Sequence, residues 1–461
     1  TFLVAWAAVS TNIFEGLTYR GPDLKLVPGL AESWEELDEG KRIRFTLRKD
    51  VKFHNGEPFN AAAVKFTFDR LLGEEGAKGP QRSNYIVIDS VEVIDDYTVD
   101  LKLKNPDPVL LTKLAGYGAM IVPPQYIAEK GEEFLNTNPV GTGPFKFVSY
   151  APKASISLAA NPDYWGGAPK LSELEYRFIS EPATAVAELQ FGRVDLVIPP
   201  TIPIGMIPTI ESDNNLEIVS VPGPTVDALR FNTRDGITAD PRVRKAIIMA
   251  VDRAAIVQSI LAGQGAEIAS FQSALSFGYD AELKPLPYDP EGARKLLQEA
   301  GVPEGATLQI DVRGNDATMN EVAQAISFYL QSIGLNVSVT PHETSTLIND
   351  IIPQGKTGAM FQQKWGGWTF DYDNTAYAMY HTGEKWNPYD KDETLDKLLE
   401  SQRPMTDRAE REKVLKEIGA YVAGKALELP LYNTNAIYAI NKRVKGFVPA
   451  PDTRLKLNEV T

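Results

Sequence analysis

The chain contains no cysteine and only three histidines in 461 residues. Without cysteine it forms no disulfide, has no thiol nucleophile and cannot build a cysteine-based zinc site. The histidines, His54, His342 and His381, are far apart in the sequence and lack the spacing of metal ligands. We therefore expect neither a bound metal nor a cofactor.

Long apolar runs are also missing. The longest one near the start, residues 2–9, falls far short of the roughly 20 residues that a membrane-spanning helix needs. No basic segment precedes it, so no signal peptide is visible. If the protein is exported, we expect this sequence to be the mature chain with its leader removed.

Positive charge is in deficit. Lys and Arg total 47 against 61 Asp and Glu, which gives a net charge of −14. An acidic surface of this kind repels nucleic acid, so nucleic acid is not an expected partner. The apolar share of 43% and charged share of 23% are those of an ordinary globular protein. Because single cores rarely exceed about 250–300 residues, 461 residues predict two or three lobes.

The first third of the chain predicts an antiparallel α+β lobe. Residues 42–48 alternate between apolar and polar, which is typical of a half-buried strand. Asn60 is placed to cap a helix that Gly73 ends. Residues 86–94 and 97–103 flank Asp95-Asp96 and predict a hairpin.

The rest of the chain has the pattern of α/β domains. Residues 171–178, 182–191 and 195–198 predict a strand–helix–strand unit. Further on, Asp240-Pro241 and Asp289-Pro290 each predict a capped helix start. A strand over residues 308–312, a helix to Gly334 and a strand over residues 335–339 predict a second α/β unit.

Several segments, in this order, resemble the peptide-type (cluster C, family 5) solute-binding proteins of ABC importers. The first three are Ile13-Phe14-Glu15-Gly16-Leu17, Val27-Pro28-Gly29-Leu30-Ala31-Glu32-Ser33-Trp34 and Phe45-Thr46-Leu47-Arg48-Lys49-Asp50-Val51-Lys52-Phe53-His54-Asn55-Gly56. The later ones are Pro139-Val140-Gly141-Thr142-Gly143-Pro144-Phe145, Asn161-Pro162-Asp163-Tyr164-Trp165, Asp240-Pro241-Arg242-Val243-Arg244-Lys245-Ala246 and Tyr288-Asp289-Pro290. Residues 1–6 take the place of the family's first strand, with a shorter connection than is usual there.

The resemblance implies an α/β fold of the periplasmic binding protein-like type II clamshell, with an extra α+β domain. Domain I would comprise residues 1–16, 144–235 and 430–461, domain II residues 17–143, and domain III residues 236–429. It further implies a monomeric receptor, not an enzyme, in the periplasm or anchored by lipid outside the cell. A dipeptide, oligopeptide or related amino-acid conjugate would be enclosed between domains I and III by hinge closure and delivered to permease subunits.

The segment from Trp365 to Tyr372 contains most of the candidate ligand-binding residues. Gly367 follows a predicted strand, where glycine lets another backbone approach closely. The resemblance implies that Asp371 binds the ligand's α-ammonium group. It also implies that backbone groups of Gly367 and Thr369 pair with the ligand main chain. The alternative is a plain turn with Asp371 as a solvated carboxylate.

Arg313 is the candidate for the other end of the ligand. It directly follows the strand over residues 308–312, and the carboxyl end of such a strand is the usual ligand crevice. A guanidinium there can bind a carboxylate through two parallel hydrogen bonds. Asp371 and Arg313 together would recognise a zwitterion, and the alternative for Arg313 is an ordinary surface position.

Three tryptophans leave two other functions open. Trp365, Trp368 and Trp386 could stack on an oligosaccharide or a sugar–amino acid conjugate, which is the alternative ligand class for the same receptor. A secreted carbohydrate hydrolase would use Asp371 and Asp373 as its carboxylate pair. Alternate residues of a strand face opposite sides, which argues against that pair acting together.

Overall fold

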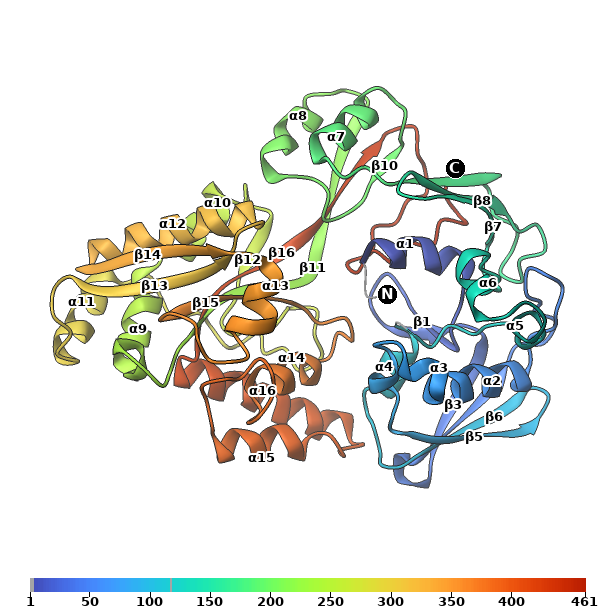
Figure 1. Cartoon of the computed structure of the whole chain (residues 1–461), viewed down its shortest axis with the longest axis horizontal. Helices are drawn as coiled ribbons and strands as arrows, with labels where there is room; N and C mark the ends of the chain where they lie inside the picture. Colours follow the sequence, from blue (N-terminus) through green and yellow to red (C-terminus); the bar gives the residue numbers. More distant parts are fainter. Residues whose placement is uncertain (1–3, 117) are drawn as a thin grey trace. The chain divides into compact units, whose positions relative to one another are not determined.

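The computed structural model describes residues 4–116 and 118–461, and its internal contacts divide the chain into two compact units. Unit 1 contains the chain up to Val221, residues 404–406 and residues 436–461, and unit 2 contains residues 222–403 and 407–435. The chain enters unit 2 within strand β11 (Leu216–Phe231) and leaves it within strand β16 (Glu428–Asn441). Both strands can be followed by label in Figure 1.

Unit 1 contains short helices and antiparallel strands. Its helices are α1 (Val4–Ile13), α2 (Ala61–Leu72), α3 (Glu74–Ala77), α4 (Leu110–Leu114), α5 (Pro124–Lys130), α6 (Glu132–Thr137), α7 (Pro182–Gln190) and α8 (Ile207–Glu211). Its strands are β1 (Thr18–Arg20), β2 (Leu26–Pro28), β3 (Ala31–Leu37), β4 (Arg42–Leu47), β5 (Ile88–Asp95), β6 (Thr98–Leu103), β7 (Phe145–Ala151), β8 (Ser155–Ala160), β9 (Glu173–Arg177) and β10 (Leu196–Val197).

The expected α+β lobe is present in unit 1. Strands β3, β4, β6 and β5 form an antiparallel sheet in that order, and β5 and β6 are the predicted hairpin. Helix α2 lies across this sheet (Figure 1), and its buried face joins the same apolar core. The side chain of Asn60 accepts a hydrogen bond from the backbone N–H of Ala63, so the predicted cap is confirmed.

Two details of unit 1 differ from the sequence-based expectations. Strand β9 belongs to an antiparallel sheet with β7 and β8, whereas β10 pairs antiparallel with β16, so residues 171–198 are not one strand–helix–strand unit. The partner of β10 comes from the far end of the chain, which local periodicity cannot reveal. Helix α1 begins at Val4, so residues 4–6 are helical and not a first strand, and residues 1–3 lie outside the described residues.

Unit 2 is built on one mixed sheet in which β16, β11, β15, β13 and β14 lie side by side and β12 pairs with β16. The remaining strands are β12 (Gly265–Glu267), β13 (Ala306–Arg313), β14 (Leu335–His342) and β15 (Met360–Gly366). The helices are α9 (Pro241–Ala250), α10 (Arg253–Ser259), α11 (Pro290–Glu299), α12 (Ala317–Ser332), α13 (Thr344–Thr346), α14 (Tyr372–Tyr380), α15 (Glu393–Ser401) and α16 (Arg408–Lys425).

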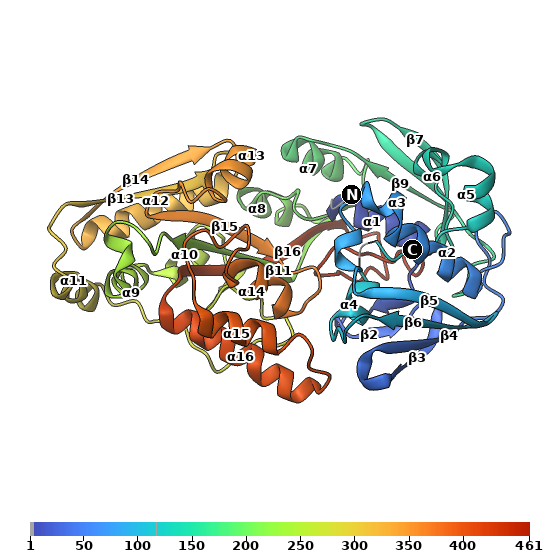
Figure 2. The same ribbon diagram turned by 60° about the horizontal axis from the view of Figure 1, so that its bottom comes forward.

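Helices cover both faces of this sheet. Strand β13 is parallel to β14 and to β15, and α12 connects β13 to β14, as the sequence predicted for residues 308–339. Leu229 and Phe231 of β11 pack in one core with α9 to α12. Val226 and Ala228, on the opposite face, pack in a second core with α14, α15 and α16. Figure 2 shows α15 and α16 running side by side.

The helix starts of unit 2 were readable from the sequence. Asp240 accepts a hydrogen bond from Arg242 N–H at the start of α9, and Asp289 does so from Gly292 N–H at the start of α11. In each helix proline occupies the first turn, where its missing N–H leaves no helical hydrogen bond unmade. The division into three domains with the boundaries given above stays a prediction, since these contacts separate two units.

Candidate functional site

The segment after β15 makes a tight turn into helix α14. Strand β15 continues through Trp365 to Gly366, and Phe370 N–H donates to the carbonyl of Gly367. Phe370 has a φ of 53°, a left-handed conformation that is unusual for a residue with a side chain. Phe277 brackets the turn, because its N–H donates to Phe370 and its carbonyl accepts from Tyr372. The turn is therefore fixed by backbone hydrogen bonds inside unit 2.

Asp371 lies at this turn as the N-cap of α14. One of its oxygens accepts from Asp373 N–H at 3.0 Å. Both oxygens also accept from the guanidinium of Arg411, at 2.6 and 2.7 Å, and both side chains are buried. Burial raises the pKa of Asp371, although Arg411 opposes that rise. Asp371 is therefore a buried half of an ion pair and not a solvated carboxylate.

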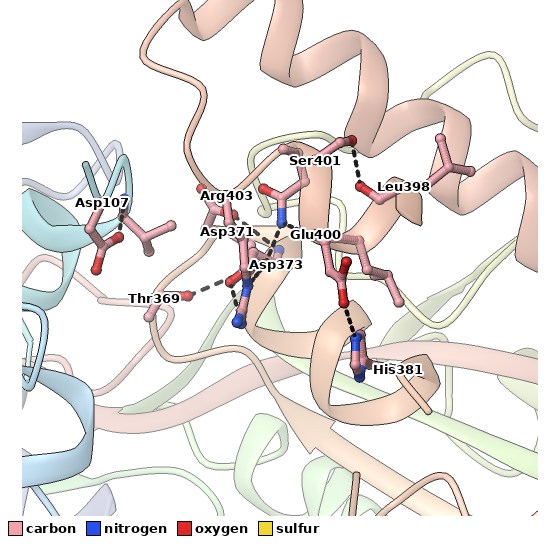
Figure 3. Close-up of polar contacts among 12 residues, drawn as sticks. Asp107, Thr369, Asp371, Asp373, His381, Leu398, Glu400, Ser401 and Arg403 are labelled. Carbon is pink, nitrogen blue, oxygen red and sulfur yellow. Dashed lines mark hydrogen bonds and ion pairs between the residues drawn. The ribbon is translucent and has the colours of Figure 1, made fainter. Parts of the chain in front are cut away.

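Asp373 has a separate set of partners. It pairs with Arg403, whose Nε lies 2.9 Å from Asp373 Oδ1, and it accepts a hydrogen bond from Gln402. Gln402 in turn accepts from Arg411 Nε at 2.9 Å, which joins the two ion pairs into one network. Figure 3 shows Asp373 and Arg403 pointing toward each other beside Asp371. Each of the two carboxylates once considered as a hydrolytic pair is thus bound by its own arginine.

Arg313 is the last residue of β13. Its backbone N–H donates to Gln362 Oε1 at 3.0 Å, which fixes the strand end to β15. Its guanidinium makes no hydrogen bond or ion pair with any residue in the described ranges 4–116 and 118–461, and its Nε is buried. Burial lowers the pKa of Arg313, while Asp227 and Asp316 oppose that change. The structure therefore holds a half-buried cation without a direct partner.

Three further charged residues lie next to Arg313, and none of them was predicted from the sequence. Lys364 of β15 places its Nζ 3.2 Å from Asp316 Oδ2 and 3.8 Å from Asp227 Oδ2. Asp227 lies directly across from Lys364 in the pairing of β11 with β15. Gln362 Nε2 donates to the same Asp316 oxygen at 3.0 Å. Arg313, Lys364, Asp227 and Asp316 form what we call the four-charge cluster.

The two carboxylates of the four-charge cluster have different environments. Asp227 is 1% exposed, and neither of its oxygens accepts a hydrogen bond from a described residue. Burial raises the pKa of Asp227 to about 6, although Lys364 opposes the rise. For Asp316 burial also favours the neutral form, but Lys364 and the N–H of Met319 outweigh it and lower the pKa. A signal for Asp227 was present in the sequence: one acid inside an apolar run, Val226-Asp227-Ala228-Leu229.

The remaining candidates line the same part of unit 2. Trp365 and Trp386 contact each other edge to face, 6.1 Å between ring centroids, and both pack on the core beneath α14 to α16. Trp368 is half-buried, and Gly367 and Thr369 are buried in the turn. Thr369 Oγ1 donates to the Asp371 carbonyl. Two of the three tryptophans thus contribute to the hydrophobic core.

Two cavities occur away from these residues. One in unit 1 is lined by polar groups that include Glu15, Tyr19 and Lys456. One in unit 2 lies beside the first half of β13, with Thr307, Gln309 and neighbouring residues in its wall. Across residues 4–116 and 118–461, no group of three or more His, Cys, Asp or Glu side chains could hold a metal ion.

Similarity to known proteins identifies the class to which this protein belongs. The model of the family described as "Bacterial extracellular solute-binding proteins, family 5 Middle" matches residues 25–387. The chain belongs to this family. The glutathione-binding protein GsiB of Pectobacterium atrosepticum is 29% identical over 456 residues, which cover 96% of this chain and 87% of GsiB.

Solved structures agree with this assignment. The oligopeptide-binding protein AppA of Bacillus subtilis, in complex with a nonapeptide, matches with a TM-score of 0.77 and 27% identity over 98% of this chain and 93% of AppA. AgaA of A. tumefacien R10, in complex with agropinic acid, matches with a TM-score of 0.78 and 28% identity over 100% of this chain and 94% of AgaA. The expected fold class, a periplasmic binding protein-like type II α/β fold, is confirmed.

Family membership establishes the general function. The chain is a solute-binding receptor of the kind that serves ABC importers, and proteins of this family act outside the cytoplasm with membrane permeases. The related proteins bind solutes for transport. Among the described residues, no helix is both long enough and apolar enough to cross a membrane.

Proposed function

We propose that this receptor captures a short peptide or a related amino-acid conjugate, and that Arg313 binds a carboxylate of that ligand. In this proposal domains I and III enclose the solute, and the monomeric protein delivers it to permease subunits of an ABC importer. The observation that carries the proposal is the state of Arg313: a half-buried guanidinium at the carboxyl end of β13 with no direct partner among the described residues.

A guanidinium in this state needs an anion. Burying a cation without a hydrogen-bonding partner is unfavourable, and binding proteins keep such groups where a ligand supplies the missing acceptor. A carboxylate fits the planar donor geometry of arginine. The relatives named above include proteins that bind glutathione and a nonapeptide, which agrees with a carboxylate-bearing ligand.

Asp371 would also accept a hydrogen bond from the ligand's ammonium group, provided that it can do so while paired with Arg411. Because Arg411 already binds both oxygens, the ligand must share the carboxylate with Arg411. Oδ1 of Asp371 already accepts from both Asp373 N–H and Arg411, so the ligand would have to bind Oδ2, which accepts from Arg411 alone among the described residues and has a second lone pair. The backbone of Gly367 and Thr369 would pair with the ligand main chain, and Trp365, Trp368 and Trp386 would border it.

Isothermal titration calorimetry with tri-alanine and glutathione tests the carboxylate hypothesis. Arg313→Ala should weaken both ligands about a hundredfold, because it removes one partner of a charge-assisted pair. Tri-alanine amide, which lacks the carboxylate, should bind the wild type and Arg313→Ala equally. Lys413→Ala, at an exposed lysine of α16, is the control and should change nothing. Equal loss for the acid and the amide would contradict the assignment of Arg313.

The same titrations decide the role of Asp371. If Asp371 receives the ligand's ammonium, Asp371→Asn should weaken tri-alanine much more than N-acetyl-tri-alanine. If its role is confined to the pair with Arg411, the variant should lose stability and affect both ligands alike. Native mass spectrometry of protein purified under mild conditions would show whether a peptide or a sugar conjugate co-purifies.

A further inference from the structure

The four-charge cluster contains more than a single carboxylate-binding arginine. Two cations, Arg313 and Lys364, stand beside two anions, Asp227 and Asp316. The ionised cluster is therefore neutral. Its members come from three adjacent strands and the cap of α12, so the sheet itself sets their spacing.

Lys364 is the accessible cation of the cluster. Its side chain is 36% exposed, whereas the side chain of Asp227 is 1% exposed. The ammonium group of Lys364 has three N–H donors and uses one of them in a hydrogen bond to Asp316. Two donors therefore stay available for an anion that already contacts Arg313. Gln362 keeps Asp316 in position by donating to the oxygen that Lys364 also contacts.

Asp227 is the buried counter-ion of both cations. Neither of its oxygens accepts a hydrogen bond from a described residue, and Lys364 Nζ lies 3.8 Å from its Oδ2. The charged or titratable groups that face it are Lys364 from β15, Arg313 from β13, Asp316 from the start of α12 and Tyr432 from β16. Its oxygens are enclosed, so a ligand reaches the cations and not Asp227.

We infer that Lys364 is a second ligand-binding cation beside Arg313, and that Asp227 makes carboxylate capture proton-linked. When Asp227 takes up a proton, the cluster changes from neutral to a charge of +1, and an anionic ligand is held more tightly. By linkage, a bound carboxylate favours the protonated form of Asp227 to the same extent. The inference rests on the proposed function, because it assumes a carboxylate-bearing ligand at Arg313.

The size of the effect follows from Coulomb's law. A unit charge about 6 Å from a carboxylate, at an effective dielectric constant between about 80 and 20, changes the affinity about threefold to a hundredfold. Burial raises the pKa of Asp227 to about 6, so the change falls between pH 5 and pH 8. Affinity for a carboxylate is expected to rise as the pH falls through this range.

The experiment measures dissociation constants of tri-alanine, tri-alanine amide and glutathione at pH 5.0, 6.5 and 8.0. In the wild type, tri-alanine and glutathione should bind at least about threefold more tightly at pH 5.0 than at pH 8.0, and the amide should show no such change. Asp227→Asn keeps the size of the side chain but carries no charge, so it should bind the acids tightly at every pH. Lys364→Met should weaken the acids about tenfold and spare the amide.

Two control variants make the result specific. His342 is a histidine that pairs with Arg313 in the register of β13 and β14, and His342→Gln must keep the pH dependence. Lys413→Met, at an exposed lysine of α16, must leave all three ligands unaffected. The inference would be overturned if the wild type bound the acids equally well at every pH, or if the pH dependence survived Asp227→Asn. Either result would leave the carboxylate site intact. Absence of binding by both acids at every pH would overturn the proposed function and this inference together.

Discussion

The buried pair of Asp371 and Arg411 allows a stability measurement that bears directly on the ligand site. Arg411→Met removes the guanidinium and keeps much of its apolar bulk. Asp371, 6% exposed, is then left without the cation that binds both its oxygens. Breaking a buried pair by removing one partner costs about 3–5 kcal/mol. We expect a loss of that size at pH 8.

The pH dependence of this loss has a definite sign. Burial already raises the pKa of Asp371 above its usual value, and removing Arg411 takes away the group that opposes the rise. In the variant the folded state therefore takes up a proton more readily than the unfolded state does. Lowering the pH neutralises the stranded carboxylate, so the destabilisation should be smaller at pH 5 than at pH 8.

Guanidinium unfolding followed by circular dichroism at both pH values provides the assay. Lys413→Met, two residues after Arg411 and exposed, is the control and should stay within about 0.5 kcal/mol of the wild type. The double variant Asp371→Asn/Arg411→Met should be more stable than Arg411→Met at pH 8, because it carries no buried charge. A stability of Arg411→Met equal to that of Lys413→Met would refute the argument and would mean that Asp371 is solvated.

Three further predictions concern unit 2. Relative to the wild type, Asp227→Asn should gain about 2.5 kcal/mol of stability between pH 4 and pH 8, because a pKa of about 6 in the folded state against 3.8 in the unfolded state makes wild-type stability fall as the pH rises between these values. Thermal unfolding at both pH values checks this. Asp289→Ala should cost about 1 kcal/mol by removing the cap of α11, whereas Glu291→Ala, two residues later in the first turn, should cost less than about 0.5 kcal/mol in the same assay. Leu330→Ala, at a fully buried position of α12, should cost about 2–5 kcal/mol in denaturant titration, and exposed Phe328→Ala should cost far less.

The parts of the fold that were predictable are those whose signals are local. The caps at Asn60, Asp240 and Asp289 act on N–H groups two or three residues away, so the sequence alone contains both partners. The crossover through α12 combines a helical period with two alternating strands and was also predictable. Strand β10 has two residues and pairs with a strand some 240 positions later, so its sheet could not be inferred.

The candidate site divides in the same way. Arg313 could be proposed because a strand end before a helix start can be read from the sequence, and this position is where α/β sheets commonly bind ligands. The partner of Asp371 was missed because Arg411 lies 40 residues further on, within a helix rich in charged residues. Nothing local distinguishes that arginine from exposed Arg408 of the same helix.

Asp227 shows what a sequence reveals when a strand is buried on both faces. Residues 226–231 of β11 are all buried, so the alternation that separates inward from outward positions disappears. Within such a run any ionisable side chain must meet a charge or a hydrogen-bond partner from another element. This run contains two ionisable residues. Asp227 faces Lys364 on one side of the sheet, and Arg230 faces Asp390 on the other. The sequence thus indicates that two opposite charges lie elsewhere in unit 2, and only the pairing of β11 with β15 identifies Lys364 as one of them.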